Sequence, residues 1–124
     1  MIGYVTLGTN HYEDAAKFYD ALFGVIGAAR VLEDDTFIAW GTSMSTPAIS
    51  IAKPFDGKPA TVGNGVMVAI VVDSPDRVNE VHAKALELGG ADEGAPGLRG
   101  EQFYAGYFRD LDGNKLNAFC MIDA

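Results

Sequence analysis

The sequence of 124 residues contains one cysteine, no long apolar run and no surplus of basic charge. Cys120 cannot form an internal disulfide, and its apolar neighbours predict a buried, inert thiol. No segment approaches the ~20 apolar residues of a membrane-spanning helix. The net charge of −8 argues against nucleic acid, whose binding proteins carry basic patches, and against an anionic membrane surface. Neither nucleic acid nor a membrane is therefore expected as a partner.

What the chain does contain is enough apolar residues, 48% of the total, to build the core of one compact domain. The opening residues, from Gly3 to Asn10, resemble a strand, so no signal peptide is predicted. With only one cysteine as well, the expected location is the cytoplasm.

The second half of the chain repeats the first at an offset of 63 residues. The run 3–10 aligns with 66–73, and Ala15, Phe18, Leu22 and Val25 align with Val78, Val81, Ala85 and Leu88. Each set follows the i, i+3, i+7, i+10 spacing of one helical face. A strand and a helix recurring in one register indicate a duplicated unit, with a cleft where the halves meet.

Each half is predicted to be a β-α-β-β-β unit within a single α+β domain, residues 1–124. Module one covers about 1–54, a linker about 55–65, and module two about 66–124; the stretch from Pro54 to Gly65 holds two prolines and three glycines. Asn10 is the expected N-cap of the first helix, and Ser74 followed by proline that of the second. The glycine-rich stretch 91–100 is predicted to be a loop, and Asp110 to Asn114 a hairpin turn.

The run Phe108-Arg109-Asp110-Leu111-Asp112-Gly113-Asn114-Lys115-Leu116 carries a family resemblance. Together with the opening Tyr4-Val5-Thr6-Leu7 and the helical Ala16-Lys17-Phe18-Tyr19, it resembles the vicinal oxygen chelate superfamily of glyoxalase I, bleomycin-resistance proteins, fosfomycin-resistance enzymes and extradiol dioxygenases. The resemblance covers almost the whole chain. It implies two curved mixed sheets around a cleft, with helices outside.

Enzymes of that superfamily usually hold a divalent metal in the cleft, and the resemblance assigns its ligand positions to Tyr4, Met67 and Asn117, with a fourth near Ser50. A thioether, an amide and a phenol are poor ligands for Mg, Mn or Fe(II), which favour carboxylate and imidazole. His11, beside the first cap, and His82, at the edge of the second helix's apolar stripe, are expected to be surface or half-buried residues. No metal and no cofactor are therefore predicted.

Strand alternation indicates which side chains line the cleft. On the last strand, Leu116, Ala118 and Cys120 should face a helix, which leaves Asn117 and Phe119 for the cleft. Arg109 could anchor an anion or could pair with Asp110 or Asp112. The repeat places Trp40 opposite Phe103. The predicted ligand-binding residues are Tyr4, Thr6, Trp40, Ser50, Met67, Tyr104, Tyr107, Arg109, Asn117 and Phe119; several of them could instead fill a core.

Two functions remain open from the sequence. One is a glyoxalase-like protein without the usual metal ligands that binds a small aromatic or apolar molecule in an aromatic cleft. The other is a lyase, isomerase or dioxygenase-like enzyme of the superfamily with an atypical site, for instance with Tyr4 or Tyr107 as acid–base. The catalytic residues are unknown. The resemblance also implies a homodimer.

Overall fold

The computed structural model describes residues 1–123, which form two compact units. Unit 1 is Met1–Val62 and unit 2 is Gly63–Ala124. Their boundary falls inside the predicted linker, and each unit is described by itself. That the two make a single domain, with a cleft where they meet, stays a prediction. No described helix is long and apolar enough to span a membrane.

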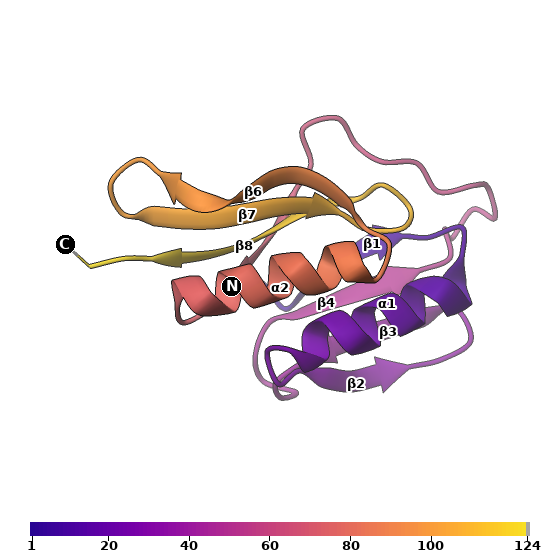
Figure 1. The fold of residues 1–124 in the computed structure, drawn as a ribbon. Helices are drawn as coiled ribbons and strands as arrows, with labels where there is room; N and C mark the ends of the chain where they lie inside the picture. Colours follow the sequence, from indigo (N-terminus) through magenta and orange to yellow (C-terminus); the bar gives the residue numbers. More distant parts are fainter. Residues whose placement is uncertain (124) are drawn as a thin grey trace. The chain divides into compact units, whose positions relative to one another are not determined.

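Unit 1 is a four-stranded mixed sheet with one helix along it (Figure 1). Its elements are β1 Tyr4–Gly8, α1 Tyr12–Gly24, β2 Ala29–Glu33, β3 Phe37–Gly41 and β4 Ala48–Ala52. The strand order is β1-β4-β3-β2. β1 runs parallel to β4, and the other pairs are antiparallel. One face of the sheet is covered by α1 and the other, here called the open face of unit 1, is not.

Unit 2 repeats this topology. Its elements are β5 Val68–Val71, α2 Pro75–Glu87, β6 Ala91–Arg99, β7 Phe103–Arg109 and β8 Lys115–Met121. The strand order is β5-β8-β7-β6, with β5 parallel to β8. The fold predicted from the repeat, α+β with two βαβββ modules, is confirmed. The side of this sheet away from α2 is called the open face of unit 2.

One predicted element is wrong, because residues 91–100 are mostly strand and not loop. The nine-residue strand β6 pairs with β7, and the pairing shifts register between Asp92 and Gly94 and again between Gly94 and Gly97. Gly94 has a φ of 157°, a conformation that other residues rarely adopt. Glycine and proline at bulges hide an edge strand from a search for apolar alternation.

The two helices begin in different ways. Ser74 caps α2 as predicted, because its Oγ accepts a hydrogen bond from the Arg77 amide at 3.2 Å. In α1 the residue before the helix is His11, and the predicted cap Asn10 is used elsewhere. The Asn10 side chain accepts from the Ala60 amide at 2.7 Å and donates to the Ala60 carbonyl at 3.0 Å. Asn10 therefore ties the segment after β4 to the start of α1.

The covered faces hold the core of each unit. In unit 1 the Trp40 ring lies 5.5 Å from Tyr19 and 5.9 Å from Phe23 of α1, centroid to centroid. In unit 2, Leu116, Ala118 and Cys120 are buried on the α2 side of β8, as alternation predicts. Burial raises the pKa of the Cys120 thiol, as expected of an inert cysteine.

The predicted hairpin turn joins β7 to β8. The Asp110 carboxylate accepts from the Asp112 amide at 3.0 Å, the Asn114 amide at 2.9 Å and the Asn114 side chain at 3.0 Å. Because these bonds fix the loop from within, the turn holds β8 in register with β7. It thereby positions Asn117, three residues beyond the turn.

Candidate functional site

The open face of unit 1 carries a polar pair that satisfies itself. The Ser50 hydroxyl, fully buried on β4, donates to the Val5 carbonyl at 3.0 Å. The neighbouring Thr6 hydroxyl lies 2.8 Å from it and donates to it in turn. Thr6 and Ser50 are direct partners across the parallel strands. Ser50 is therefore satisfied within the protein and does not require a ligand.

The open face of unit 2 carries a polar group that is not satisfied. Asn117 on β8 is only 1% exposed, yet its Oδ1 has no hydrogen-bond partner among the described residues. Its neighbours across the strands are Ala69 of β5 and Tyr107 of β7. Buried polar atoms are nearly always hydrogen-bonded, so an exception points to a strained site or to an absent partner.

These two places correspond in the two sheets. Thr6 pairs with Ser50 and Ala69 pairs with Asn117, each where the first strand of the unit meets the last. On the other side, Ala39 lies opposite Ser50 and Tyr107 lies opposite Asn117. A methyl group thus stands in unit 2 where unit 1 has the threonine hydroxyl. The Asn117 amide oxygen consequently has no hydroxyl donor like the one that Thr6 offers to Ser50.

Around Asn117 the open face of unit 2 is aromatic and basic. Phe119 stacks on Phe103 with ring centroids 5.1 Å apart. The Tyr107 ring has the Arg99 guanidinium carbon 5.4 Å and the Lys115 ammonium 5.6 Å from its centroid. Sequence reasoning missed both cations, although the glycines of β6 that make room for Arg99 are visible in the sequence.

Arg109 pairs with Glu93 and not with Asp110 or Asp112, and its role as an anchor for an anion stays a prediction. Its guanidinium pairs with Glu93 of β6 and donates to the Gly113 carbonyl at 2.8 Å. The Arg109 hydrogen bond, with its charge, lowers the pKa of the Glu93 carboxyl. Arg109 therefore joins β6 to the β7–β8 turn.

Two predicted site residues do not lie on the open faces. Trp40 faces α1, where its indole donates to Asp20 at 2.8 Å. Tyr104 faces α2 and donates to the Asn79 side chain at 2.8 Å. Tyr104 is three residues from Tyr107, so alternation places the two on opposite faces. The offset of the repeat had aligned Trp40 with Phe103, but the sheet registers make Trp40 the counterpart of Phe108. Trp40 was therefore expected on the face opposite to the one it occupies.

The remaining predicted residues lie where alternation places them. Tyr4 is 58% exposed and meets Phe37 edge-on at 5.8 Å, and Met67 precedes β5 and is 40% exposed.

The two histidines do not belong to the strands that form the open faces. His11 precedes α1, whereas His82 is only 5% exposed, with its Nε2 3.1 Å from Asp92 and 3.1 Å from the Tyr107 carbonyl. His82 is thus buried, which corrects its expected position at or near the surface. It fits beneath β7 because Gly106 has no Cβ to meet its ring.

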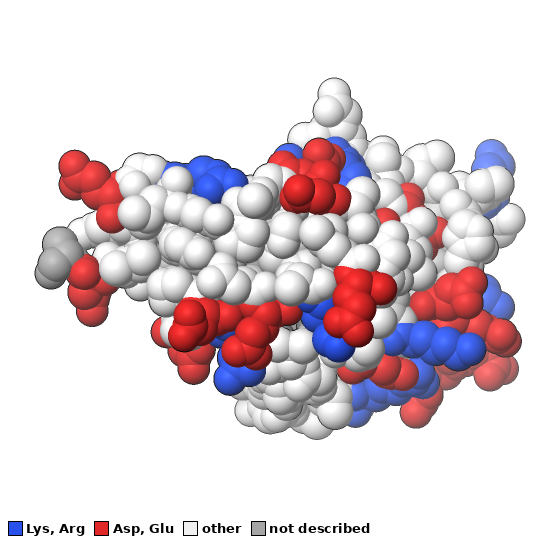
Figure 2. Space-filling model, viewed as in Figure 1, with Lys and Arg blue, Asp and Glu red and all other residues white. Residues whose placement is uncertain are grey.

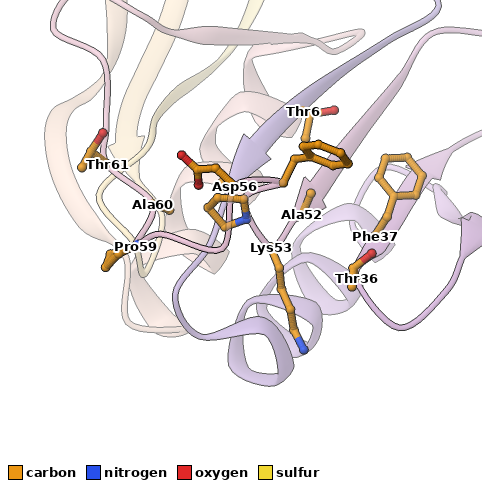
Figure 3. A pocket seen from close by; sticks show the side chains of 12 residues that line it. Thr6, Thr36, Phe37, Ala52, Lys53, Asp56, Pro59, Ala60 and Thr61 are labelled. Carbon is orange, nitrogen blue, oxygen red and sulfur yellow. The ribbon is translucent and has the colours of Figure 1, made fainter.

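Unit 1 has a groove that the sequence did not predict (Figure 3). It encloses about 680 Å³ between the end of the open face, at Thr6 and Phe37, and the segment 53–61. Lys53 extends away from Thr6 and Phe37, and its ammonium lies 5.2 Å from the Tyr12 ring centroid. No described side chain of the groove has a buried polar atom without a partner.

The family's metal positions do not fit a metal ion here. Tyr4 and Ser50 in unit 1 offer a phenol and a hydroxyl that already bonds to Val5 and Thr6, and Met67 and Asn117 in unit 2 offer a thioether and a neutral amide. Divalent metals of these enzymes favour carboxylate and imidazole ligands. Among the described residues, no group of three or more His, Cys, Asp or Glu could hold a metal.

Known proteins share this fold over nearly the whole chain. A glyoxalase/bleomycin resistance protein from Albidiferax ferrireducens T118 is 34% identical, with 97% of this chain and 98% of that chain covered and a TM-score of 0.89. A lactoylglutathione lyase from Agrobacterium tumefaciens (18% identity, 97% and 92% covered, TM-score 0.70) and the fosfomycin resistance protein FosX from Mesorhizobium loti (16%, 97% and 91%, 0.69) show the fold alone. No curated protein matches the chain significantly.

The family model of the Glyoxalase/Bleomycin resistance protein/Dioxygenase superfamily matches residues 1–118. The resemblance drawn from the sequence is therefore confirmed. The chain belongs to the Glyoxalase/Bleomycin resistance protein/Dioxygenase superfamily.

Proposed function

We propose that this protein binds a small aromatic molecule on the open face of unit 2, without a metal at the family's ligand positions. The observation that carries the proposal is the unpartnered Oδ1 of Asn117. An O–H or N–H group of the ligand donates to this oxygen, and the ligand's ring lies beside Tyr107 and Phe119.

The energetics favour a ligand over a purely structural role for Asn117. A buried acceptor without a donor costs the protein about 1–3 kcal/mol. A ligand that supplies the donor recovers this energy on binding, so the cost in the free protein becomes affinity in the complex. A ligand without a donor would leave the amide unpaired and would bind less well.

Two further expectations belong to this proposal. The protein pairs as a homodimer, which the family resemblance and the exposed Val66, Met67 and Val71 support. It works in the cytoplasm, for which the support is its single, buried, unpaired cysteine.

The experiment is an NMR screen of small phenols and anilines against the native protein and Asn117→Leu. Leucine has a similar volume and no polar atom, so Asn117→Leu should stay folded and lose about tenfold in affinity for the fragments that bind. Ser50→Ala, at the corresponding place in unit 1, is the matched control and should bind normally. Fragments that bind Asn117→Leu as tightly as the native protein would overturn the proposal.

A further inference from the structure

We infer that the ligand of this face is an organic anion, with its charged group held beside the Tyr107 ring by the nearer of the two cations Arg99 and Lys115. The inference rests on the proposed function and specifies the class of ligand. Three strands supply the parts: Arg99 from β6, Tyr107 from β7, and Lys115 with Asn117 from β8.

The strand registers place these side chains on one face. Tyr107 is the direct cross-strand partner of Asn117, and Lys115 precedes Asn117 by two residues on the same strand. Arg99 pairs with Phe103, which shares a face with Tyr107 by alternation. The two cations approach the same ring, at 5.4 Å and 5.6 Å from its centroid. Unit 2 thus gathers two positive charges, a phenol and an unsatisfied amide.

The position of Arg99 depends on two glycines of β6. A Cβ at Gly94 would lie 3.2 Å from one terminal nitrogen of the guanidinium, and a Cβ at Gly97 would lie 3.3 Å from the other. The Gly94 Cβ would also lie 3.3 Å from the Tyr107 ring. Without these side chains the guanidinium lies back along β6, where it donates to the Ala95 carbonyl at 2.9 Å. Since a guanidinium has five N–H donors, others remain available for an anion.

Arg99 and Lys115 differ from the cations of unit 2 that form ion pairs. Arg77 meets Glu80 at 3.2 Å, Lys84 meets Glu87 at 3.2 Å, and Arg109 pairs with Glu93. Figure 2 likewise shows blue atoms next to red ones along the lower part of the visible side. Among the described residues, no carboxylate lies within 4.0 Å of Arg99 or Lys115. Lys115 contributes to lowering the pKa of Glu93, but less than Arg109, which bonds that carboxylate directly.

Because acidic residues outnumber basic ones in this chain, cations without a nearby carboxylate point to a role in binding. In a chain of net charge −8, two cations without a carboxylate within ion-pair distance approach one half-buried aromatic ring next to a buried acceptor. An anion beside the Tyr107 ring gains charge-assisted hydrogen bonds from the cation on that side of the ring. The ligand therefore carries both a negatively charged group, which a cation binds, and an N–H or O–H group, which donates to Asn117 Oδ1.

The test measures calorimetric binding of three probes with the same phenol ring: 4-hydroxybenzoate, 4-hydroxyphenylphosphonate and the neutral 4-hydroxybenzamide. At least one of the two anions should bind about tenfold more tightly than the amide at low salt. The anion that binds better identifies the charged group as carboxylate or phosphonate. Equal binding of all three would overturn the inference.

Two double variants separate local charge from total charge. Arg99→Gln with Lys115→Gln should weaken the anions about tenfold and leave the amide unchanged. Arg77→Gln with Lys84→Gln removes the same charge from α2 and should change anion binding by less than about twofold, because exposed charges at a distance are screened. Equal losses in the two double variants would also overturn the inference.

Asn117→Leu separates the two proposals. If this variant weakens all three probes equally and the probes bind the native protein equally, the proposed function stands and the anion assignment fails. If no probe shows binding that depends on Asn117, the proposed function fails, and with it the inference.

Discussion

The two sheets of this protein place different side chains at corresponding positions. In unit 1, Thr6 and Ser50 bond to each other and Ser50 bonds to the Val5 carbonyl, so the polar atoms are satisfied internally. In unit 2, Ala69 and Asn117 occupy the same places, and the amide oxygen has no partner in the described chain. One duplicated scaffold thus serves stability in one half and, as we propose, binding in the other.

The largest expected effect compares a covered face with an open one. Trp40→Ala should lower the free energy of unfolding by about 3–5 kcal/mol, because it removes a buried ring from the unit 1 core. Tyr107→Ala, at an aromatic residue of the open face of unit 2, should lower it by less than about 1 kcal/mol. Urea denaturation measures both. Comparable losses would mean that Tyr107 is a core residue, contrary to the site described above.

A smaller effect concerns the satisfied pair of unit 1. Ser50→Ala should lower the free energy of unfolding by about 1–2 kcal/mol, because Thr6 loses its acceptor and the Val5 carbonyl loses a donor. Ser45→Ala, in an exposed loop, is the control and should change it by less than about 0.5 kcal/mol. A Ser50 variant as stable as the native protein would show that the hydroxyl pair contributes nothing.

Ala69→Ser makes unit 2 resemble unit 1. The new hydroxyl can donate to Asn117, so the free energy of unfolding should rise by about 0.5–1.5 kcal/mol while affinity for phenols falls. In an Asn117→Leu background the same substitution should give no gain, since the acceptor is absent. A gain that persists in that background would refute the assignment of Asn117 Oδ1 as the unmet acceptor.

The smallest expected effect is the acid sensitivity of each unit. Hydrogen bonds from Arg30 and then Trp40 lower the pKa of Asp20 in unit 1, and the Gly94 amide followed by His82 lowers that of Asp92 in unit 2. A carboxyl with a lowered folded pKa contributes stability above its unfolded pKa of about 4, and this stability is lost as the pH falls through the folded value.

The variants Asp20→Asn and Asp92→Asn should therefore be less stable than the native protein at pH 7 and should approach its stability at about pH 3. Asp20 should show the larger difference, because both of its carboxylate oxygens accept from the charged Arg30 guanidinium, in addition to the bond from Trp40. The urea midpoint at the two pH values reports this. A deficit that stays constant with pH would rule out ionisation as its cause.

The sequence predicted the repeat, the topology and the faces of the last strand, because these depend on local alternation and spacing. It did not predict the face of Trp40, because the offset of the repeat holds only through the helices. The nine residues of β6, with their bulges, replace the five of β2, which shifts every later correspondence.

Arg99 and Lys115 were beyond sequence reasoning for a different reason. They meet Tyr107 from two different strands, and such contacts depend on register, which β6 changes twice. The groove beside segment 53–61 was missed because the two prolines and the glycine of that segment resemble an unstructured linker. The position of the segment is instead fixed by long-range hydrogen bonds such as those between the Asn10 side chain and the Ala60 backbone.

The most direct measurement is an NMR titration of the ¹⁵N-labelled protein with 4-hydroxybenzoate. We expect the largest shift changes at the Asn117 side-chain amide and the backbone of Tyr107 and Lys115, with Thr6 and Ser50 unmoved. Fluorescence of Trp40 should change little, because its ring is buried against α1. Shift changes confined to the unit 1 groove, around Phe37 and the segment 53–61, would contradict the assignment of the binding site to unit 2.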